Sequence, residues 1–270
     1  MVLIGIGHAG HNLIQEFGDH HKKISILPED FPKNCKKVED YEEFCPDFSN
    51  RFDFSENECW VALSGSGKIP GCTLRVLEII KNKKINILYI CPDLSICNSM
   101  QLKRNKVIFN VLQEYARSGL LNRMYLFSNK SILENIGDQP IVTMYKMINK
   151  QIANCIETIQ WFKEQDPTMG SWHEPKNISR ICTLSVGDFK KNDEKNLFPI
   201  DNLTETGYIY SISKTQLEKN KDVLKTIKGK ISNDKSNNIM SSFIIYSSQH
   251  KQSFYYSLKF THVIQTLETK

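Results

Sequence analysis

The sequence predicts an α/β fold with a parallel-sheet domain over residues 1–140, a long central helix over residues 141–165 and a smaller α+β domain over residues 178–270. Three observations support this prediction. Short apolar segments alternate with helical patterns throughout the first half, as in parallel sheets covered by helices on both faces. An apolar helical pattern longer than an average globular helix then follows Pro140. After Ile178, short alternating strands surround one charged helix, which is typical of a mixed or antiparallel sheet.

The expected elements follow from the period of the apolar residues. In the first half, strands are expected at residues 2–6, 23–27, 59–63, 85–90 and 124–127. Helices are expected at residues 12–17, 38–44, 72–81, 100–118 and 142–163. In the second half, we expect strands at residues 181–186, 207–212, 242–247 and 253–264, a helix at 214–228, and polar turns at 190–195 and 232–238.

The composition describes an ordinary globular protein, with 40% hydrophobic and 24% charged residues in 270. The net charge of +5 is spread over the whole chain, so a nucleic-acid partner is not supported. Without a targeting signal or an apolar run near the ~20 residues of a spanning helix, we expect a cytoplasmic protein with no membrane partner. The eight cysteines include no Cys-x-x-Cys pair, so we expect buried free thiols and name no metal ligand.

The first predicted strand runs into a glycine pattern, Gly5-x-Gly7-x-x-Gly10. The next predicted strand, at residues 23–27, is followed by Pro28-Glu29-Asp30, so that Asp30 lies about twenty residues past Gly10. This arrangement is a dinucleotide-binding fingerprint, in which the glycines admit a pyrophosphate to a helix N-terminus and the acid binds a ribose hydroxyl. Such turns recur in every nucleotide-binding α/β fold, so the pattern does not name the nucleotide. The nearby His20-His21 pair is expected to be a solvated helix end.

A second glycine loop follows the predicted strand at 59–63 and holds three glycines within seven residues, Gly65, Gly67 and Gly71. Glycine lets the backbone approach a ligand closely, and the helix that follows presents its amides to an anion. Ligands bind at the carboxyl ends of parallel strands, where both glycine loops are expected. The two loops are therefore predicted to form two walls of one nucleotide pocket.

The two glycine loops and the central helix resemble those of the tubulin/FtsZ superfamily of GTP-binding filament proteins, over about residues 1–180. The resemblance implies a Rossmann-like GTP-binding domain. In the first loop, His8 and His11 replace two of the family's glycines, as phosphate-facing donors or as capping residues. The implied nucleotide-binding residues are Gly7, His8, Ala9, Gly10 and Asn12 in the first loop, Gly65, Ser66, Gly67, Lys68 and Gly71 in the second, and Tyr145 and Asn149 in the central helix.

Each of these groups has a role in the family. The glycine loops hold the phosphates, the aromatic residue stacks on guanine, and the Asn four residues later pairs with it; here these would be Tyr145 and Asn149. The second loop departs from the family, because Lys68-Ile69-Pro70 replaces Thr-Gly-Ser/Thr. Lys68 can supply a positive charge to the phosphates, but Ile69 stands where a P-loop has its magnesium-binding hydroxyl.

The family's catalytic motif, Asn-x-Asp-x-x-Asp, follows the central helix and inserts into the nucleotide site of the next subunit. The alignment places Trp172 at the Asn, Glu174 at the first acid and Asn177 at the second. General-base chemistry needs a carboxylate or a comparable group near the attacking water, and only Glu174 keeps one. The resemblance therefore implies slow or altered hydrolysis. Trp172 is alternatively an interface anchor.

The resemblance as a whole implies a divergent short member, similar to phage and plasmid tubulin-like proteins, that binds GTP or GDP with Mg²⁺ and self-associates head to tail into filaments. Two alternatives stay open. One is an NAD-dependent oxidoreductase that uses the N-terminal glycine pattern and Asp30, although it leaves the second loop unexplained. The other is a non-polymerising nucleotide-binding module, which the degenerate catalytic motif favours.

Overall fold

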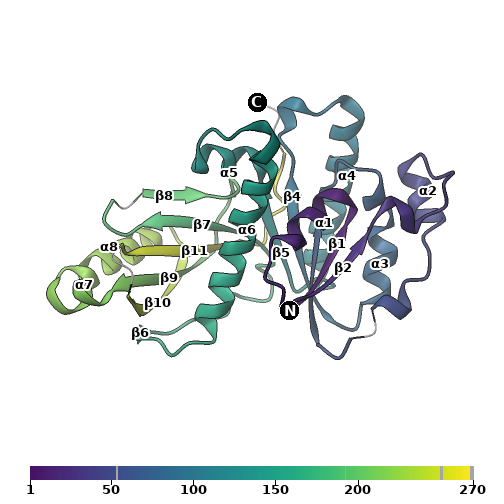
Figure 1. The fold of residues 1–270 in the computed structure, drawn as a ribbon. Coiled ribbons are helices and arrows are strands. Elements are labelled where there is room, and N and C mark those ends of the chain that lie inside the picture. The colour runs from purple at the N-terminus through teal and green to yellow at the C-terminus, as the bar shows by residue number, and fades with distance from the viewer. Residues whose placement is uncertain (53, 192, 250–251, 268–270) are drawn as a thin grey trace.

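The computed structural model describes residues 1–52, 54–191, 193–249 and 252–267. These residues form one twisted sheet of eleven strands with helices packed on its faces (Figure 1). The strands are β1 Val2–Ile6, β2 Lys22–Ile26, β3 Glu58–Leu63, β4 Lys84–Cys91, β5 Arg123–Ser128, β6 Met169–Gly170, β7 Ile181–Asp188, β8 Asp193–Asn196, β9 Glu205–Ser213, β10 Met240–Ser248 and β11 Phe254–Thr261. The α-helices are α1 Gly7–Gln15, α2 Val38–Glu43, α3 Thr73–Ile79, α4 Ser99–Ser118, α5 Asn129–Ile136, α6 Ile141–Lys163, α7 Lys214–Lys219 and α8 Val223–Ser236.

The first half of the sheet is parallel, in the order β2-β1-β3-β4-β5. Successive residues of a strand point to opposite faces, and each face of this half is apolar. Val61 packs into a core cluster with residues of α3 and α4, whereas its neighbour Trp60 packs into a second cluster with residues of α1, α5 and α6. Burial on both faces explains the continuous apolar runs and confirms the predicted α/β fold.

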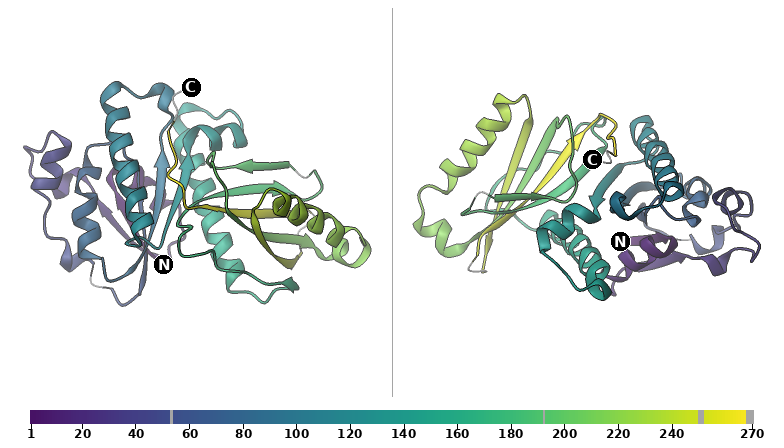
Figure 2. Two further views of the ribbon diagram at one scale, coloured as in Figure 1. Left: turned by 180° about the vertical axis from the view of Figure 1, so that it is seen from behind. Right: turned by 90° about the horizontal axis from the view of Figure 1, so that it is seen from above.

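Helix α6 lies between the parallel half and the remaining strands (Figures 1 and 2). Its residues Ile148, Ile152 and Ile156 are buried at helical spacing in a cluster that also contains Leu13 of α1 and Ile209 of β9. The sheet continues beside α6 without a break, because β7 pairs in parallel with β5. The division into domains at residues 1–140 and 178–270 therefore stays a prediction.

The second half adds antiparallel pairings of β11 with β7 and β9, while β10 pairs in parallel with β9. The prediction of one helix at 214–228 is wrong, because this segment forms two helices, α7 and α8. Helix α8 continues to Ser236 and so includes part of the turn predicted at 232–238. The predicted turn at 190–195 contains most of β8, and α5 was not predicted. Figure 2 shows α8 lying across one face of these strands.

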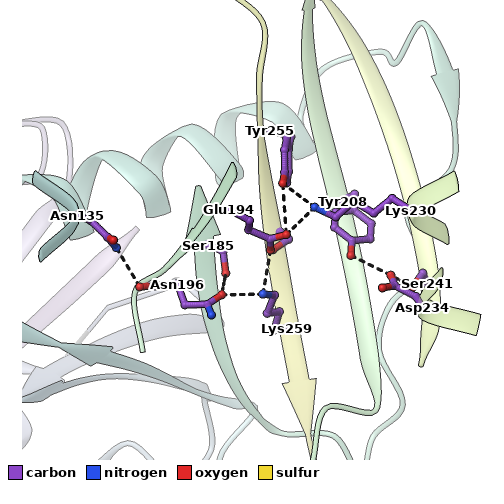
Figure 3. A network of polar contacts seen from close by, with 11 residues as sticks. Asn135, Ser185, Glu194, Asn196, Tyr208, Lys230, Asp234, Ser241, Tyr255 and Lys259 are labelled. Atoms are coloured by element: carbon purple, nitrogen blue, oxygen red, sulfur yellow. Dashed lines mark hydrogen bonds and ion pairs between the residues drawn. The ribbon is translucent and has the colours of Figure 1, made fainter. Parts of the chain in front are cut away.

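A partly buried polar network holds β8 in place (Figure 3). The Glu194 carboxylate pairs with the Lys259 ammonium at 2.9 Å and the Lys230 ammonium at 2.5 Å, and it accepts a hydrogen bond from Ser257. Burial raises the pKa of this carboxyl, but the charges of Lys259 and Lys230 outweigh burial and lower the pKa to about 2. Glu194 is therefore ionised in the folded protein at neutral pH.

All eight cysteines are free thiols, and five of them are buried. Within the described part of the chain, no helix is both long enough and apolar enough to cross a membrane.

Candidate functional site

A cavity of about 270 Å³ lies at the carboxyl ends of β1 and β3, between the first turn of α1 and the second glycine loop. Six of the residues predicted to bind a nucleotide line it: Gly7, His8, Ala9, Ser66, Gly67 and Lys68. The chain thus brings its two glycine loops together at one cavity. The lining does not include the other six predicted nucleotide-binding residues, which are Gly10, Asn12, Gly65, Gly71, Tyr145 and Asn149.

The amino end of α1 faces the cavity because the chain turns directly from β1 into the helix at Gly7. Gly7 has a φ of 70°, a left-handed conformation that glycine adopts without strain. Helix α1 therefore begins at Gly7 and not at the predicted residue 12. The preceding residue, Ile6, makes no side-chain capping bond. The first backbone amides of α1 are thus available to an anion in the cavity.

Gly5 and Gly10 serve packing and not ligand contact. A Cβ atom at Gly10 would lie 2.1 Å from the backbone oxygen of Ala62 in β3, and one at Gly5 would lie 2.7 Å from the backbone of Gly10. Both glycines therefore let α1 lie directly against the sheet. This close packing fixes the amino end of α1 beside the second loop.

The second loop is fixed from behind by β4 and α4. A Cβ atom at Gly65 would lie 2.4 Å from the Tyr89 hydroxyl, which donates a hydrogen bond to Asn105 Oδ1 at 2.7 Å. Arg104 Nε donates to the backbone oxygen of Ser66 at 2.9 Å. Sequence reasoning missed both helix residues, although the buried Asn105 lies four residues before Phe109 on the apolar face of α4.

The end of the second loop packs on α2. A Cβ atom at Gly71 would lie 2.3 Å from the backbone oxygen of Val38, so this glycine makes room for α2 and stands away from the cavity. Lys68 is exposed at the rim of the cavity. Backbone amides of Lys36 and Lys37 lower the pKa of the nearby Asp40 carboxyl, and the Lys68 charge lowers it further. A positive charge therefore stands at the mouth of the cavity.

The predicted base-binding residues lie on the first turns of α6, which contacts α1. Tyr145 is 48% exposed, and Asn149 is 7% exposed. A half-exposed aromatic ring is free to stack on a flat ligand, and a largely buried amide is a selective hydrogen-bonding group. Their assignment to guanine stays a prediction.

Glu174 and Asn177 lie far from the glycine loops. Glu174 lines a separate polar cavity of about 200 Å³, together with Glu58, Lys84 and Arg123 at the amino ends of β3, β4 and β5. An eight-residue strand such as β4 spans about 26 Å. Glu174 therefore lies at the opposite edge of the sheet, out of reach of the glycine-loop cavity of its own chain. Asn177 is exposed in the same segment.

Trp172 is held by its own chain. Its indole Nε1 donates to Glu174 Oε1 at 3.2 Å, and the Lys163 ammonium lies 5.0 Å from the centre of its ring. A Cβ atom at Gly207 would lie 2.5 Å from the ring, so glycine at this position admits the indole. These contacts orient the Glu174 carboxylate. The role of Trp172 as an interface anchor stays a prediction.

Asp30, the acid of the dinucleotide alternative, is already engaged. Its carboxylate accepts from the backbone amide of Leu27 at 2.8 Å and from Arg51 at 2.5 Å. Burial raises the pKa of Asp30, but the hydrogen bonds from Arg51 and Leu27 outweigh burial and lower it. A ribose hydroxyl would have to compete with these partners, so the geometry disfavours NAD binding.

Comparisons with known proteins are informative at the level of structure. No protein-family model and no curated protein matches the sequence. The fold is similar to that of TubZ from Bacillus thuringiensis serovar israelensis in a GTPγS-form protofilament, with a TM-score of 0.73 and 13% identity over 96% of this chain and 85% of that chain. An empty FtsZ dimer from M. jannaschii has a TM-score of 0.65 and 12% identity over 96% of this chain and 87% of that chain. CetZ2 from Haloferax volcanii, in a GTPγS-bound protofilament, has a TM-score of 0.69 and 11% identity over 96% and 92%.

Proposed function

Because the chain has the fold of the tubulin/FtsZ superfamily, we propose that it is a tubulin-like filament protein that binds GTP or GDP and associates head to tail. One observation carries the proposal: two glycine loops from distant parts of the sequence line one cavity at the carboxyl ends of parallel strands. Such strand ends are where open α/β sheets bind ligands. Among solved structures with this fold, TubZ and CetZ2 occur as protofilaments with GTPγS.

The lining of the cavity suits phosphate groups. The amino end of α1 and the second loop offer backbone amides, Ser64 and Ser66 offer hydroxyls, and Lys68 offers a positive charge. Among the described residues that line the cavity, no carboxylate opposes an anion. Mg²⁺ is bound in many nucleotide sites mainly through phosphate oxygens and water. We therefore propose that Mg²⁺ enters with the nucleotide and that Ser64 and Ser66 are the residues that would hold it.

The base would lie toward α6, with guanine stacked on Tyr145 and hydrogen-bonded to Asn149. The exposure of these two side chains supports this assignment.

We further propose that the protein acts in the cytoplasm.

The position of Glu174 supports a shared catalytic site. Glu174 and the glycine loops occupy opposite edges of the sheet. Stacking two chains head to tail brings the Glu174 edge of one onto the glycine-loop edge of the next. Glu174 would then position the attacking water for a neighbour's nucleotide, with Asn177 beside it. A single carboxylate in place of the family's two acids supports slow hydrolysis.

The proposal is tested by incubating the purified protein with GTP, ATP or NADH and measuring binding, sedimentation, light scattering and phosphate release. We expect GTP to bind most tightly, and we expect polymer to sediment with GTP and Mg²⁺. Tight binding of NADH without GTP would overturn the proposal. GTP binding without sedimentable polymer at any protein concentration would instead select the non-polymerising module.

A residue-level test uses Asn149→Ala, which removes the proposed guanine partner. Loss of a hydrogen bond from a desolvated site costs about 1–3 kcal/mol, so GTP affinity is expected to fall about ten-fold or more. The control is Lys150→Ala, an exposed neighbour on α6. Circular dichroism checks that both variants fold. Equal GTP affinity in Asn149→Ala and the control would remove this part of α6 from the site.

A further inference from the structure

Three potential metal ligands meet at the amino-end edge of the sheet, where the turn between α1 and β2 faces α6. They are His20 and His21 in the turn and Glu157 on α6, and one ligand atom from each lies within 4.8 Å of the other two. His21 Nε2 is 3.0 Å from Glu157 Oε1, and the two imidazole rings have centroids 3.8 Å apart. The cluster joins segments that are 136 residues apart in the sequence.

We propose that His20, His21 and Glu157 bind a divalent transition-metal ion, and that Zn²⁺ is the ion best suited to the site. Two imidazoles and one carboxylate are ligands that zinc accepts, with water in the fourth position of a tetrahedron. Bonds of about 2 Å in a tetrahedron place neighbouring ligand atoms roughly 3.3 Å apart. The His21–Glu157 pair is already near this separation. His20 is exposed, so its ring can rotate to complete the site.

The second shell of the cluster also fits a metal. The backbone amide of Gly18 donates to Glu157 Oε1 at 2.9 Å, which orients the carboxylate. A hydrogen bond that orients a carboxylate in this way holds a metal ligand in position. His21 presents its Nε2 atom to the same Glu157 oxygen at 3.0 Å.

The experiment titrates Zn²⁺ and Co²⁺ into the full-length protein after removal of metals with a chelator. We expect one equivalent to bind in the wild type, and we expect His20→Ala and Glu157→Gln each to weaken binding at least ten-fold. At about 100 times the dissociation constant, Zn²⁺ should raise the Tm of the wild type by roughly 5 °C. Each ligand variant should show at most about half of this shift at the same concentration.

Two controls make the result decisive. His262→Ala removes another exposed histidine and should bind Zn²⁺ as the wild type does. The Co²⁺ spectrum distinguishes this site from the free cysteines, because nitrogen and oxygen ligands give no thiolate charge-transfer band. His20→Ala alters only an exposed side chain, so it tests the site even if Glu157→Gln unfolds. Equal Zn²⁺ affinity in the wild type and His20→Ala, a thiolate spectrum or no binding would each overturn the proposal, whatever the outcome of the GTP experiments.

Discussion

The substitution Glu194→Gln tests the partly buried network that attaches β8 to the second half of the sheet. Glutamine keeps the shape of the side chain but removes its charge. The ammonium groups of Lys230 and Lys259 would then lose their common anionic partner. Removing one partner of a buried pair is strongly destabilising, because an uncompensated charge stays behind.

The magnitude follows from the pKa of Glu194, which falls from its ordinary value of 4.5 to about 2 in the folded protein. A difference of about 2.5 units corresponds to about 3 kcal/mol of stability. Burial lowers the pKa of Lys230 even with Glu194 beside it, so this lysine gains less from the pair than the carboxylate does. We therefore expect Glu194→Gln to lower the free energy of unfolding by about 3 kcal/mol at pH 7, at the lower end of the range for broken buried pairs.

The pH dependence has a definite sign. The folded pKa of Glu194 lies below the unfolded one, so its contribution is complete above pH 4.5 and is lost as the pH falls toward 2. The change over this window therefore reports the Glu194 carboxyl. The stability difference between wild type and Glu194→Gln should shrink by roughly 2 kcal/mol between pH 5 and pH 3.

Urea unfolding, followed by circular dichroism at several pH values, measures this difference. The control is Glu114→Gln on α4, whose ion pair with Arg117 is exposed on both sides and should contribute less than about 1 kcal/mol. A Glu194→Gln variant as stable as the control at pH 7 would refute the reasoning. So would a stability difference from wild type that stays constant as the pH falls.

Further predictions concern the glycine-loop cavity. Gly10→Ala should destabilise the protein by about 2–3 kcal/mol and weaken GTP binding, because the added Cβ meets the backbone of β3. Gly229→Ala, in α8, meets nothing within 4 Å and should stabilise the protein by about 0.5–1 kcal/mol in the same denaturation assay; a similar loss in both variants would contradict the packing argument. Arg104→Ala should weaken GTP binding about ten-fold by releasing the Ser66 carbonyl, whereas the exposed Lys103→Ala should leave it unchanged in a fluorescent-nucleotide titration. Equal affinities would show that this hydrogen bond does not hold the loop.

The architecture was predictable because it rests on local periodicity. The inner strands of the parallel half are buried on both faces, and α6 presents an apolar residue at nearly every turn, so both patterns are strong in the sequence. The end of the helix expected at residues 100–118 is also local, because Gly119 follows α4 with a left-handed φ of 89°. Strand β8 was not predictable, because its Glu194 pairs with Lys230 and Lys259. These two lysines lie 36 and about 65 residues further along the chain.

The meeting of the two glycine loops at one cavity was predictable, but the role of each glycine was not. Gly7 is needed for its own backbone conformation, a local requirement. Gly10, Gly65 and Gly71 are needed because Ala62, Tyr89 and Val38 approach them, and such contacts are not visible in a single sequence. The same limit applies to Arg104, whose partner Ser66 lies 38 residues earlier. Sequence reasoning can locate a glycine loop, but long-range contacts decide which glycines face a ligand.

The parallel strands give the molecule two chemically different edges, one with the glycine loops and one with Glu174. In the proposed head-to-tail filament, a row of such chains would have polarity, and its two ends would differ. At one end the last nucleotide would be open to solvent, whereas a neighbouring chain would cover every other nucleotide. At the other end Glu174 would be uncovered until the next nucleotide-bearing chain binds. Growth and loss of subunits would then differ between the ends, without any further component.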